Sequence, residues 1–304
     1  MSLDKAFNDL KNIMDKENIL INEPMKNHTS FKVGGPANML LEPQSKEEIS
    51  DIIKYLNKNK IKYFVIGNGS NLLVKDGGLD LVVIKIGEKF SDFKINKNKV
   101  ISQSGALLSV LSKSILNQSL KGFEFASGIP GTLGGAVYMN AGAYGGEMKN
   151  IVSKVTVVNK VGEIIVLDSK DLSFEYRNSS IAKNEYIVVE VELELEEGNY
   201  EQIKAYMDEL TIKRTTKQPL DMPSAGSTFK RPVGYYAGKL IEDTGLRGLY
   251  HRGAQVSSKH CGFVINKDNA SAKDILTLID IIKSAVYDKF KVKLEEEVRI
   301  IGKD

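Results

Sequence analysis

Residues 122–146, GFEFASGIPGTLGGAVYMNAGAYGG, decide the fold expected for this chain. Eight of these residues are glycine, and the residues between them are mostly small or apolar with almost no charge. A solvated linker would contain more Ser, Lys and Glu. Glycine permits positive φ angles and lets a backbone approach a ligand closely, and several inward-facing amides form a nest for an anion such as a pyrophosphate. A Gly-rich turn between core elements is the alternative, but the length and apolar character favour a cofactor cradle.

The composition is that of a globular protein with two or three domains. The chain has 304 residues, of which 42% are hydrophobic and 27% charged, with a formal net charge of +3. No long basic block occurs, so we expect no nucleic-acid partner. The single cysteine, Cys261, is typical of a reducing cytoplasm. The sequence has no apolar signal core and no run of 18 apolar residues, and its three histidines are too scattered for a metal site, so we expect a cytoplasmic protein with no membrane or metal.

Hydrophobic periodicity predicts alternating helices and strands. Helices are expected at residues 1–20, 45–60, 107–117, 203–214, 235–243 and 271–290. Strands are expected at residues 63–66, 81–86, 100–103, 152–158, 163–167, 186–195, 261–265 and 294–301. Ser45 and Glu48 can form a capping box before the second helix. Pro219 and Pro223 mark a boundary, so we expect an α+β fold with a break near residues 200–220.

A second glycine-containing loop, residues 67–74 with the sequence GNGSNLLV, follows a predicted strand directly. Its free amides could bind a phosphate. It is not a Rossmann fingerprint, because Leu72 stands at the third glycine position, and no Gly-Lys-Ser/Thr follows to make a P-loop. A tight turn is the alternative for this loop alone. Together with the Gly-rich stretch about 60 residues later, it favours a nucleotide cofactor.

Two segments combine turn residues with polar side chains. Residues 27–37, NHTSFKVGGPA, contain a Gly-Gly-Pro turn preceded by hydroxyl groups, and on its own this segment is best interpreted as a structural turn. Residues 175–179, EYRNS, place Arg177 beside Tyr176, an arrangement that suits carboxylate or phosphate recognition. A surface arginine with a structural role is the alternative.

Two more segments lie in the C-terminal third. Residues 223–232, PSAGSTFKRP, put the Ser227 hydroxyl beside a flexible glycine and near Lys230 and Arg231, so Ser227 could donate a proton; a capped turn is the alternative. Residues 294–302, LEEEVRIIG, place Glu295, Glu297 and Arg299 on one face of a predicted strand. An exposed edge strand is the alternative here. The chain lacks the order of a Ser-His-Asp triad and the motifs H-E-x-x-H and C-x-x-C, which leaves a cofactor as the source of difficult chemistry.

Seven motifs in order give the chain a family resemblance. They are TSFKVGGPA, GNGSNLLV, SGIPGTLGGAVYMNAGAYGGE, FEYRNSS, PSAGSTFKRP, GAQVSSKHCGFVIN and LEEEVRIIG. Each is moderately specific, and together they resemble the UDP-N-acetylenolpyruvoylglucosamine reductase family over almost the whole chain beyond residue 20. The spacing is similar to that of the shorter subtype of this family.

The resemblance implies an α+β flavoprotein fold of the vanillyl-alcohol-oxidase type. After an N-terminal helix at residues 1–20, an FAD-binding domain of two α+β subdomains would span residues 21–200, and a substrate-binding domain would span residues 201–304. Residues of both glycine loops would hold the FAD pyrophosphate, namely Gly67, Asn68, Gly69, Ser70, Asn71, Ser127, Gly128, Ile129, Pro130, Gly131, Gly134 and Gly135. A third group would pack beside the isoalloxazine, namely Asn140, Ala141, Gly142 and Tyr144.

The implied reaction reduces UDP-N-acetylglucosamine enolpyruvyl ether to UDP-N-acetylmuramate in bacterial peptidoglycan synthesis, with NADPH as the hydride donor and FAD as the cofactor. Motif matching assigns Arg177 to the substrate carboxylate, Ser227 to proton donation and Glu297 to polarising the carboxylate or assisting proton transfer. Tyr176, Lys217, Lys230 and Arg231 would contact the substrate, the three basic residues at its diphosphate. Cys261 stands where the family motif suggests a small residue, and we interpret it as a packing substitution.

The resemblance also implies that FAD is held without a covalent bond, because no His or Cys lies in the Gly-rich segments. We expect a monomer. Two other functions stay open at this point: an FAD-dependent sugar or alcohol oxidase on the same fold, and a flavin- or nucleotide-binding protein without catalysis. Oxygen consumption with a sugar or alcohol would support the first. Ligand binding without turnover would support the second.

Overall fold

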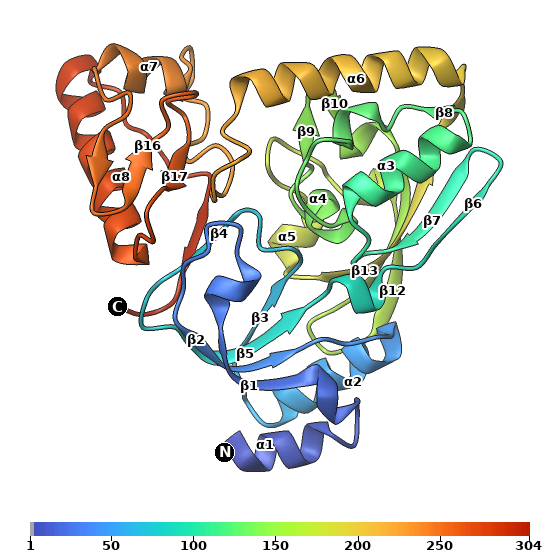
Figure 1. Ribbon diagram of the computed structural model, residues 1–304. Helices are drawn as coiled ribbons and strands as arrows, with labels where there is room; N and C mark the ends of the chain where they lie inside the picture. Colours follow the sequence, from blue (N-terminus) through green and yellow to red (C-terminus); the bar gives the residue numbers. More distant parts are fainter. Residues whose placement is uncertain (1–2) are drawn as a thin grey trace. The chain divides into compact units, whose positions relative to one another are not determined.

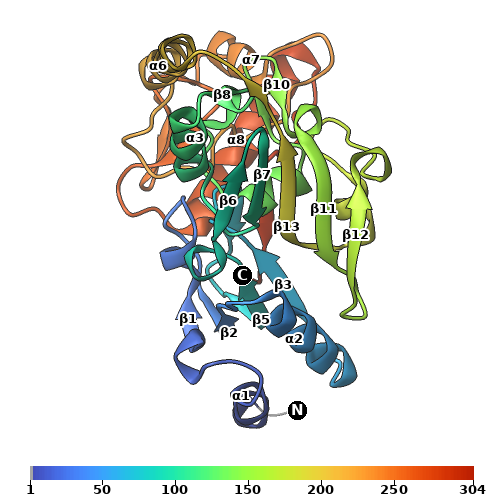
Figure 2. The same ribbon diagram turned by 90° about the vertical axis from the view of Figure 1, so that its right-hand side faces the viewer.

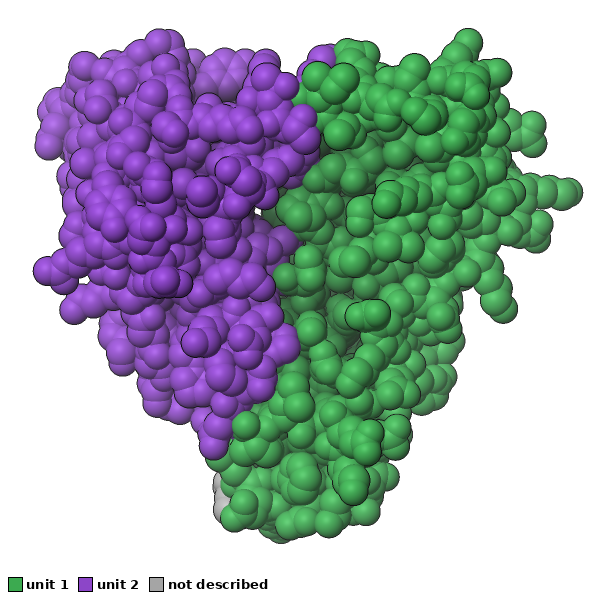
Figure 3. Space-filling view, in the orientation of Figure 1, with its two compact units in different colours: residues 1–21, 39–68, 81–212 green, residues 22–38, 69–80, 213–304 purple. Residues whose placement is uncertain are grey.

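The computed structural model describes residues 3–304 and divides into two compact units (Figure 3). Among the described residues, unit 1 comprises residues 3–21, 39–68 and 81–212, and unit 2 comprises residues 22–38, 69–80 and 213–304. Unit 2 therefore contains two short segments from the first 80 residues of the chain in addition to the C-terminal third. The division of the chain into functional domains at residues 20 and 200 remains a prediction.

The N-terminal part of the chain forms a four-stranded sheet in the order β1-β2-β5-β3. Its elements are α1 (Leu3–Leu10), β1 (Ile19–Pro24), β2 (Pro36–Leu41), α2 (Lys46–Lys58), β3 (Tyr63–Ile66) and β5 (Leu79–Lys85). The apolar stripe of α2, with Ile49, Ile52, Ile53 and Leu56 fully buried, contributes to a core of unit 1, as the periodicity predicts. The Ser45 side chain caps α2 by accepting from the Glu48 amide at 3.0 Å. Glu48 bonds the Gln44 amide rather than that of Ser45, so the predicted capping box is only half formed.

An antiparallel five-stranded sheet in the order β12-β11-β13-β7-β6 forms the second subdomain of unit 1 (Figure 2). Its strands are β6 (Phe93–Asn96), β7 (Lys99–Gln103), β11 (Val152–Val158), β12 (Ile164–Asp168) and β13 (Ile187–Glu194). In β13, Val189, Val191 and Leu193 are fully buried, as the alternation at residues 186–195 predicts. Three helices complete this subdomain, α3 (Leu108–Asn117), α4 (Leu133–Tyr138) and α5 (Ser180–Asn184), and a small pair joins β8 (Leu120–Lys121) to β14 (Glu196–Glu197).

Unit 2 contains the three-stranded antiparallel sheet β15-β16-β17, against which the long helix α8 packs (Figure 1). Its elements are β4 (Leu72–Val74), α7 (Ala237–Asp243), β15 (Tyr250–His251), β16 (Ala254–Val256), β17 (Val264–Asn266), α8 (Ala272–Phe290) and β18 (Arg299–Ile301), and α6 (Tyr200–Lys217) crosses from unit 1 into unit 2. A Ser271–Asp274 capping box begins α8, and the Asp76 carboxylate also accepts from the amides of Ala272 and Lys273 at 2.9 Å each.

The predicted N-terminal helix and two predicted strands are shorter than expected. Of residues 1–20, the described helix α1 covers only Leu3–Leu10, and Ile19 already begins β1. Of residues 294–301, only Arg299–Ile301 forms a strand, which pairs in parallel with β4, and of residues 261–265 only the end belongs to β17. The segment before β18 is held instead by an isolated bridge between Phe229 and Glu296. The pairing of β18 is with β4, more than 200 residues earlier in the chain, so no local pattern sets the length of β18.

Candidate active site

The first glycine loop, residues 67–71, connects β3 to β4. In unit 1, a Cβ on Gly67 would lie 2.3 Å from Thr132 Oγ1, so only glycine allows this close approach. Gly69, in unit 2, has a φ of +62°, and its carbonyl accepts from the Ser30 amide at 3.1 Å. The amides of Asn68, Gly69 and Ser70 donate to no other residue between 3 and 304. Such a run of open amides can bind a phosphate.

The second glycine segment folds into a tight turn followed by the short helix α4. Thr132 caps α4 by accepting from the Gly135 amide at 3.4 Å, and a Cβ on Gly134 would lie 2.7 Å from Ser104 Cβ. Within the described residues, the amides of Gly128 and Gly131 have no acceptor, and the buried Ser104 Oγ has no partner. Open amides and an unpaired hydroxyl in a glycine-lined turn suit a pyrophosphate, so these residues fit the implied FAD. The other predicted residues of this turn, Ser127, Ile129 and Pro130, are each at least partly exposed.

The residues predicted to lie beside the isoalloxazine form a hairpin after α4. The strands β9 (Gly142–Ala143) and β10 (Gly146–Glu147) are joined by Tyr144 and Gly145, both with positive φ, as in a type I′ turn. Tyr144 is 44% exposed, whereas Ala141 and Asn140 are buried. The Asn140 side chain bonds Glu147 Oε2 at 2.8 Å, the Glu175 carbonyl at 3.1 Å and the Lys149 amide at 3.0 Å.

Arg177 lies on a tight turn of unit 1. In this turn, residues 175–178, the backbones of Glu175 and Asn178 bond each other in both directions at 2.9 and 3.2 Å, and Arg177 takes the left-handed conformation with a φ of +55°. Its guanidinium lies 5.3 Å from the centre of the Tyr176 ring. Ser179, which follows the turn, caps α5 and donates to the Tyr138 carbonyl at 2.6 Å. The predicted arginine and aromatic residue are therefore brought together.

Ser227 and Glu297 lie on two segments of unit 2 that backbone hydrogen bonds join. The Glu297 amide donates to the Thr228 carbonyl at 2.9 Å, and the Lys230 amide donates to the Glu295 carbonyl at 2.8 Å. Asn71 Nδ2 donates to the Glu297 carbonyl at 3.1 Å. The Ser227 side chain is exposed, and Glu297 is half-buried. The residue that follows Ser227 is thus fixed beside Glu297.

The three consecutive glutamates have different surroundings. Lys230 Nζ pairs with Glu295 at 3.2 Å, and Lys283 Nζ pairs with Glu296 at 2.7 Å. Burial acts to raise the pKa of Glu296, but the Lys283 hydrogen bond, a backbone hydrogen bond and the charges of Lys283 and Lys230 outweigh it and lower this pKa. Glu295 and Glu296 thus each pair with a lysine, and the choice of Glu297 among the three stays a prediction from the motif.

The predicted diphosphate contacts are exposed basic residues of unit 2. Lys217 is the last residue of α6, and Lys230 forms the ion pair with Glu295. The Arg231 guanidinium lies 4.0 Å from the centre of the Tyr236 ring. Exposed cations of this kind can meet an anionic substrate, although Lys230 already has a carboxylate partner.

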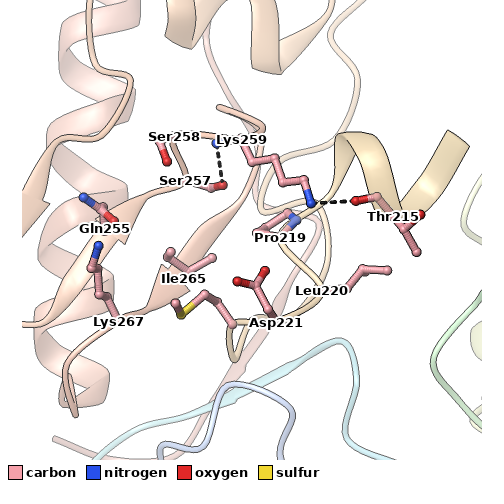
Figure 4. Close-up of a pocket in the computed structure, with 11 residues that line it drawn as sticks. Thr215, Pro219, Leu220, Asp221, Gln255, Ser257, Ser258, Lys259, Ile265 and Lys267 are labelled. Atoms are coloured by element: carbon pink, nitrogen blue, oxygen red, sulfur yellow. Dashed lines mark hydrogen bonds between the residues drawn. The ribbon is translucent and has the colours of Figure 1, made fainter. Parts of the chain in front are cut away.

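A pocket of about 420 Å³ opens in unit 2 between the end of α6 and the strands β16 and β17 (Figure 4). Thr215, Leu220, Asp221, Gln255, Lys259 and Lys267 are among its lining residues. Lys259 Nζ donates to the Thr215 carbonyl at 2.6 Å, across the pocket in Figure 4. Sequence reasoning did not single out these two lysines, although Lys259 lies within the motif GAQVSSKHCGFVIN.

Two family models match the chain. The model of an FAD binding domain matches residues 37–168, and the model of the C-terminal domain of UDP-N-acetylenolpyruvoylglucosamine reductase matches residues 218–301. The UDP-N-acetylenolpyruvoylglucosamine reductase of Clostridioides difficile (strain 630) is 58% identical over 304 residues, covering 100% of both chains. The chain belongs to the UDP-N-acetylenolpyruvoylglucosamine reductase family. The resemblance drawn from the seven motifs is thereby confirmed.

Solved structures agree with the membership in the reductase family. The crystal structure of UDP-N-acetylenolpyruvylglucosamine reductase from Thermus caldophilus superposes with a TM-score of 0.79 at 35% identity, covering 93% of this chain and 97% of that chain. Alkyldihydroxyacetonephosphate synthase, with a TM-score of 0.50 at 14% identity, covers 64% of this chain and 40% of that one, and shows a shared fold alone. The predicted α+β fold, with an FAD-binding region before a C-terminal domain, and the predicted FAD cofactor are confirmed.

The cysteine of this reductase-family chain is a core residue. Cys261 is buried among apolar side chains of unit 2, and burial raises the pKa of its thiol. Both observations agree with a packing role. No helix in residues 3–304 has the length and apolar character needed to cross a bilayer.

Proposed function

We propose that this protein reduces the enolpyruvyl ether of UDP-N-acetylglucosamine to UDP-N-acetylmuramate, with NADPH as the hydride donor and non-covalent FAD as the cofactor, in peptidoglycan synthesis. The observation that carries the proposal is the full-length match to reductases of this name, together with the open amides of two glycine segments. The matched ranges 37–168 and 218–301 support an FAD-binding domain at residues 21–200 and a substrate-binding domain at residues 201–304.

FAD supplies hydride transfer in this reaction, and the pyrophosphate would be held by amides of Gly67–Asn71 and of residues 127–135. Addition of a hydride to C3 of the enolpyruvyl group leaves negative charge on C2 and the adjoining carboxylate. Arg177, with its planar guanidinium, would bind that carboxylate and stabilise the developing charge. The remaining step is delivery of a proton to C2.

Ser227 would donate that proton, because its exposed hydroxyl lies beside the flexible Gly226 and next to the Thr228–Glu297 backbone contact. Glu297 would polarise the carboxylate or assist the proton transfer. Tyr176, Lys217, Lys230 and Arg231 would contact the substrate. The pocket that Lys259 and Lys267 line has the size of a ligand site, and we propose it as part of the substrate region.

A visible absorption spectrum tests the function directly. We expect flavin bands in the purified protein that bleach with anaerobic NADPH and return when the UDP-N-acetylglucosamine enolpyruvyl ether is added. A colourless protein that also fails to take up FAD would overturn the proposal. Reoxidation by oxygen with sugar or alcohol turnover would favour an oxidase, and flavin binding without either half-reaction would favour a binding protein.

We further propose a monomeric cytoplasmic enzyme without a nucleic-acid or membrane partner. The small net charge and the single, buried cysteine support this. Sedimentation equilibrium across a range of protein concentrations would test the monomer, and a mass of twice 33.6 kDa would contradict it.

A further inference from the structure

The buried side chain of Asn140 connects the glycine segment to the turn that carries Arg177. Asn140 is 2% exposed and follows α4 with a φ of +45°. Its Nδ2 donates to Glu147 Oε2 at 2.8 Å and to the Glu175 carbonyl at 3.1 Å, while its Oδ1 accepts from the Lys149 amide at 3.0 Å. Three hydrogen bonds thus tie one amide group to three separate points of the backbone and side chains.

These bonds use the donor capacity of the Asn140 side chain. A carboxamide has two N–H donors, and here one faces Glu147 and the other faces the Glu175 carbonyl. No N–H of this side chain is left for a flavin ring. The structure therefore gives the Asn140 side chain a task within the protein, and packing of its segment beside the isoalloxazine stays a separate prediction.

The turn at residues 175–178 needs such an anchor. Arg177 has a φ of +55°, a left-handed conformation that is unfavourable for a non-glycine residue, so surrounding contacts must hold it there. Asn140 holds the first residue of the turn through the Glu175 carbonyl, and the Ser179–Tyr138 bond of 2.6 Å holds the end. Both anchors come from the end of α4 and the residues after it, and Figure 1 shows α4, α5 and β9 in the same part of unit 1.

Glu147, which accepts a hydrogen bond from the Asn140 side chain, carries a negative charge. Its pKa is lowered by the hydrogen bond from Lys149, against a smaller effect of burial, and then by the Asn140 bond and the charges of Lys149 and Arg177. Asn140 thus bonds an ionised carboxylate and the backbone of the arginine turn at once. Loss of its donors would leave both acceptors without this link.

We propose that Asn140 is a positioning residue for the enolpyruvyl half-reaction: it fixes the turn at residues 175–178 so that Arg177 meets the substrate carboxylate. This inference rests on the proposed function, because it takes Arg177 as the carboxylate-binding residue. A displaced guanidinium would weaken both substrate binding and charge stabilisation, since small errors of position are costly in an active site. Flavin binding and flavin reduction by NADPH do not need this arginine on our assignment.

The test compares Asn140→Ala with Asn98→Ala in the holoenzyme by stopped-flow absorbance. Asn98 is a matched control, because its Nδ2 also donates to a distant carbonyl in unit 1, that of Leu195 at 3.2 Å. For Asn140→Ala we expect the second-order rate constant of flavin reoxidation by the enolpyruvyl ether to fall about 10- to 100-fold. We expect the rate of flavin reduction by NADPH and the Kd for FAD to stay within about twofold, as in Asn98→Ala.

The double variant Asn140→Ala/Arg177→Lys separates a positioning role from a general loss of structure. If Asn140 acts through Arg177, the double variant is no worse in reoxidation than Arg177→Lys alone. The proposal would be overturned if the two substitutions slowed reoxidation multiplicatively in the double variant. An equal fall in both half-reactions of Asn140→Ala, or a larger Kd for FAD, would overturn it as well. Near-normal reoxidation in Arg177→Lys would instead reject the role of Arg177, and thus the proposed site.

Asn140→Asp keeps the inference testable if the alanine variant does not fold. Aspartate has the same shape and can still accept from the Lys149 amide, but when ionised it has no donor for Glu147 or the Glu175 carbonyl. At pH 8 we expect it to lose reoxidation in the same selective way. Wild-type reoxidation in a folded Asn140→Asp protein would overturn the proposal.

Discussion

The two units hold their candidate functional side chains by different means. In unit 1, Arg177 lies on a short turn that the buried side chains of Asn140 and Ser179 anchor at its two ends. In unit 2, Ser227 and Glu297 lie on two extended segments that backbone bonds join, with the amides of Glu297 and Lys230 donating across at 2.9 and 2.8 Å. Backbone bonds persist whatever side chain is present. The turn of Arg177 is therefore tied to its surroundings by two side-chain hydrogen bonds, whereas the segment of Glu297 is tied to its neighbour by backbone hydrogen bonds.

Unit 2 also contains an asparagine amide bonded to the carbonyl of a site segment, which makes the comparison testable. Asn71 Nδ2 donates to the Glu297 carbonyl at 3.1 Å, much as Asn140 donates to the Glu175 carbonyl. Because Glu297 has backbone anchors besides Asn71, we expect substitution of Asn71 to cost less than substitution of Asn140.

The largest effect expected in unit 2 is that of Ser227→Ala, which removes the proposed proton donor and leaves both backbone anchors intact. Flavin reduction by NADPH should stay normal, and reoxidation by the enolpyruvyl ether should slow by roughly 10²- to 10⁴-fold, the usual contribution of a general acid. Stopped-flow measurement of the two half-reactions checks this. An equal loss in both would reject Ser227 as the proton donor.

A smaller effect is expected for Asn71→Ala, which removes one hydrogen bond and keeps the backbone amide of the first glycine loop. Since such a bond contributes about 0.5–1.5 kcal/mol, reoxidation should slow by roughly 2- to 10-fold, with an unchanged Kd for FAD. Stopped-flow kinetics of flavin reoxidation in Asn71→Ala, with Asn98→Ala as the control, would measure this. If Asn71→Ala slowed reoxidation more than Asn140→Ala does, the proposed difference in how the two units hold their site residues would be wrong.

The smallest effect is a pH-dependent loss of stability in Lys283→Met, which removes the ion pair of Glu296, the neighbour of Glu297. The pKa of Glu296 is lowered below its ordinary 4.5 on folding, so the pair stabilises the protein above that pH and loses its effect as the pH falls through the lower folded value. We expect a loss of about 1 kcal/mol at neutral pH, since the pair is partly exposed, and a smaller loss near pH 3.

Urea unfolding of Lys283→Met at both pH values checks this prediction. Lys204→Met is the matched control, because it removes an exposed pair with Asp208 on α6 and should change stability little. An equal loss at neutral and acid pH in Lys283→Met would show that packing of the long side chain, rather than its charge, holds the segment before β18.

Local signals were sufficient for the longer elements. The strands at Tyr63–Ile66 and Val152–Val158 have the predicted bounds, and α2 and α8 begin directly after the serine caps Ser45 and Ser271. Such elements are visible because their apolar spacing and caps lie within one stretch of chain. The order of seven motifs likewise identified the family, which depends on residue identity and spacing alone.

What only the tertiary structure decided is how these residues are held. The pairing of β4 with β18 and the Asn71–Glu297 bond join positions more than 200 residues apart, and no local pattern encodes such pairs. The alternation at residues 294–302 placed Glu295 and Glu297 on one face, but the lysine partners of Glu295 and Glu296 became visible only in the fold. The sequence by itself determined the family, the cofactor class and the candidate residues. The fold decided which side chains and backbone groups hold these candidates, because hydrogen bonds form between atoms that are near in space, not in sequence.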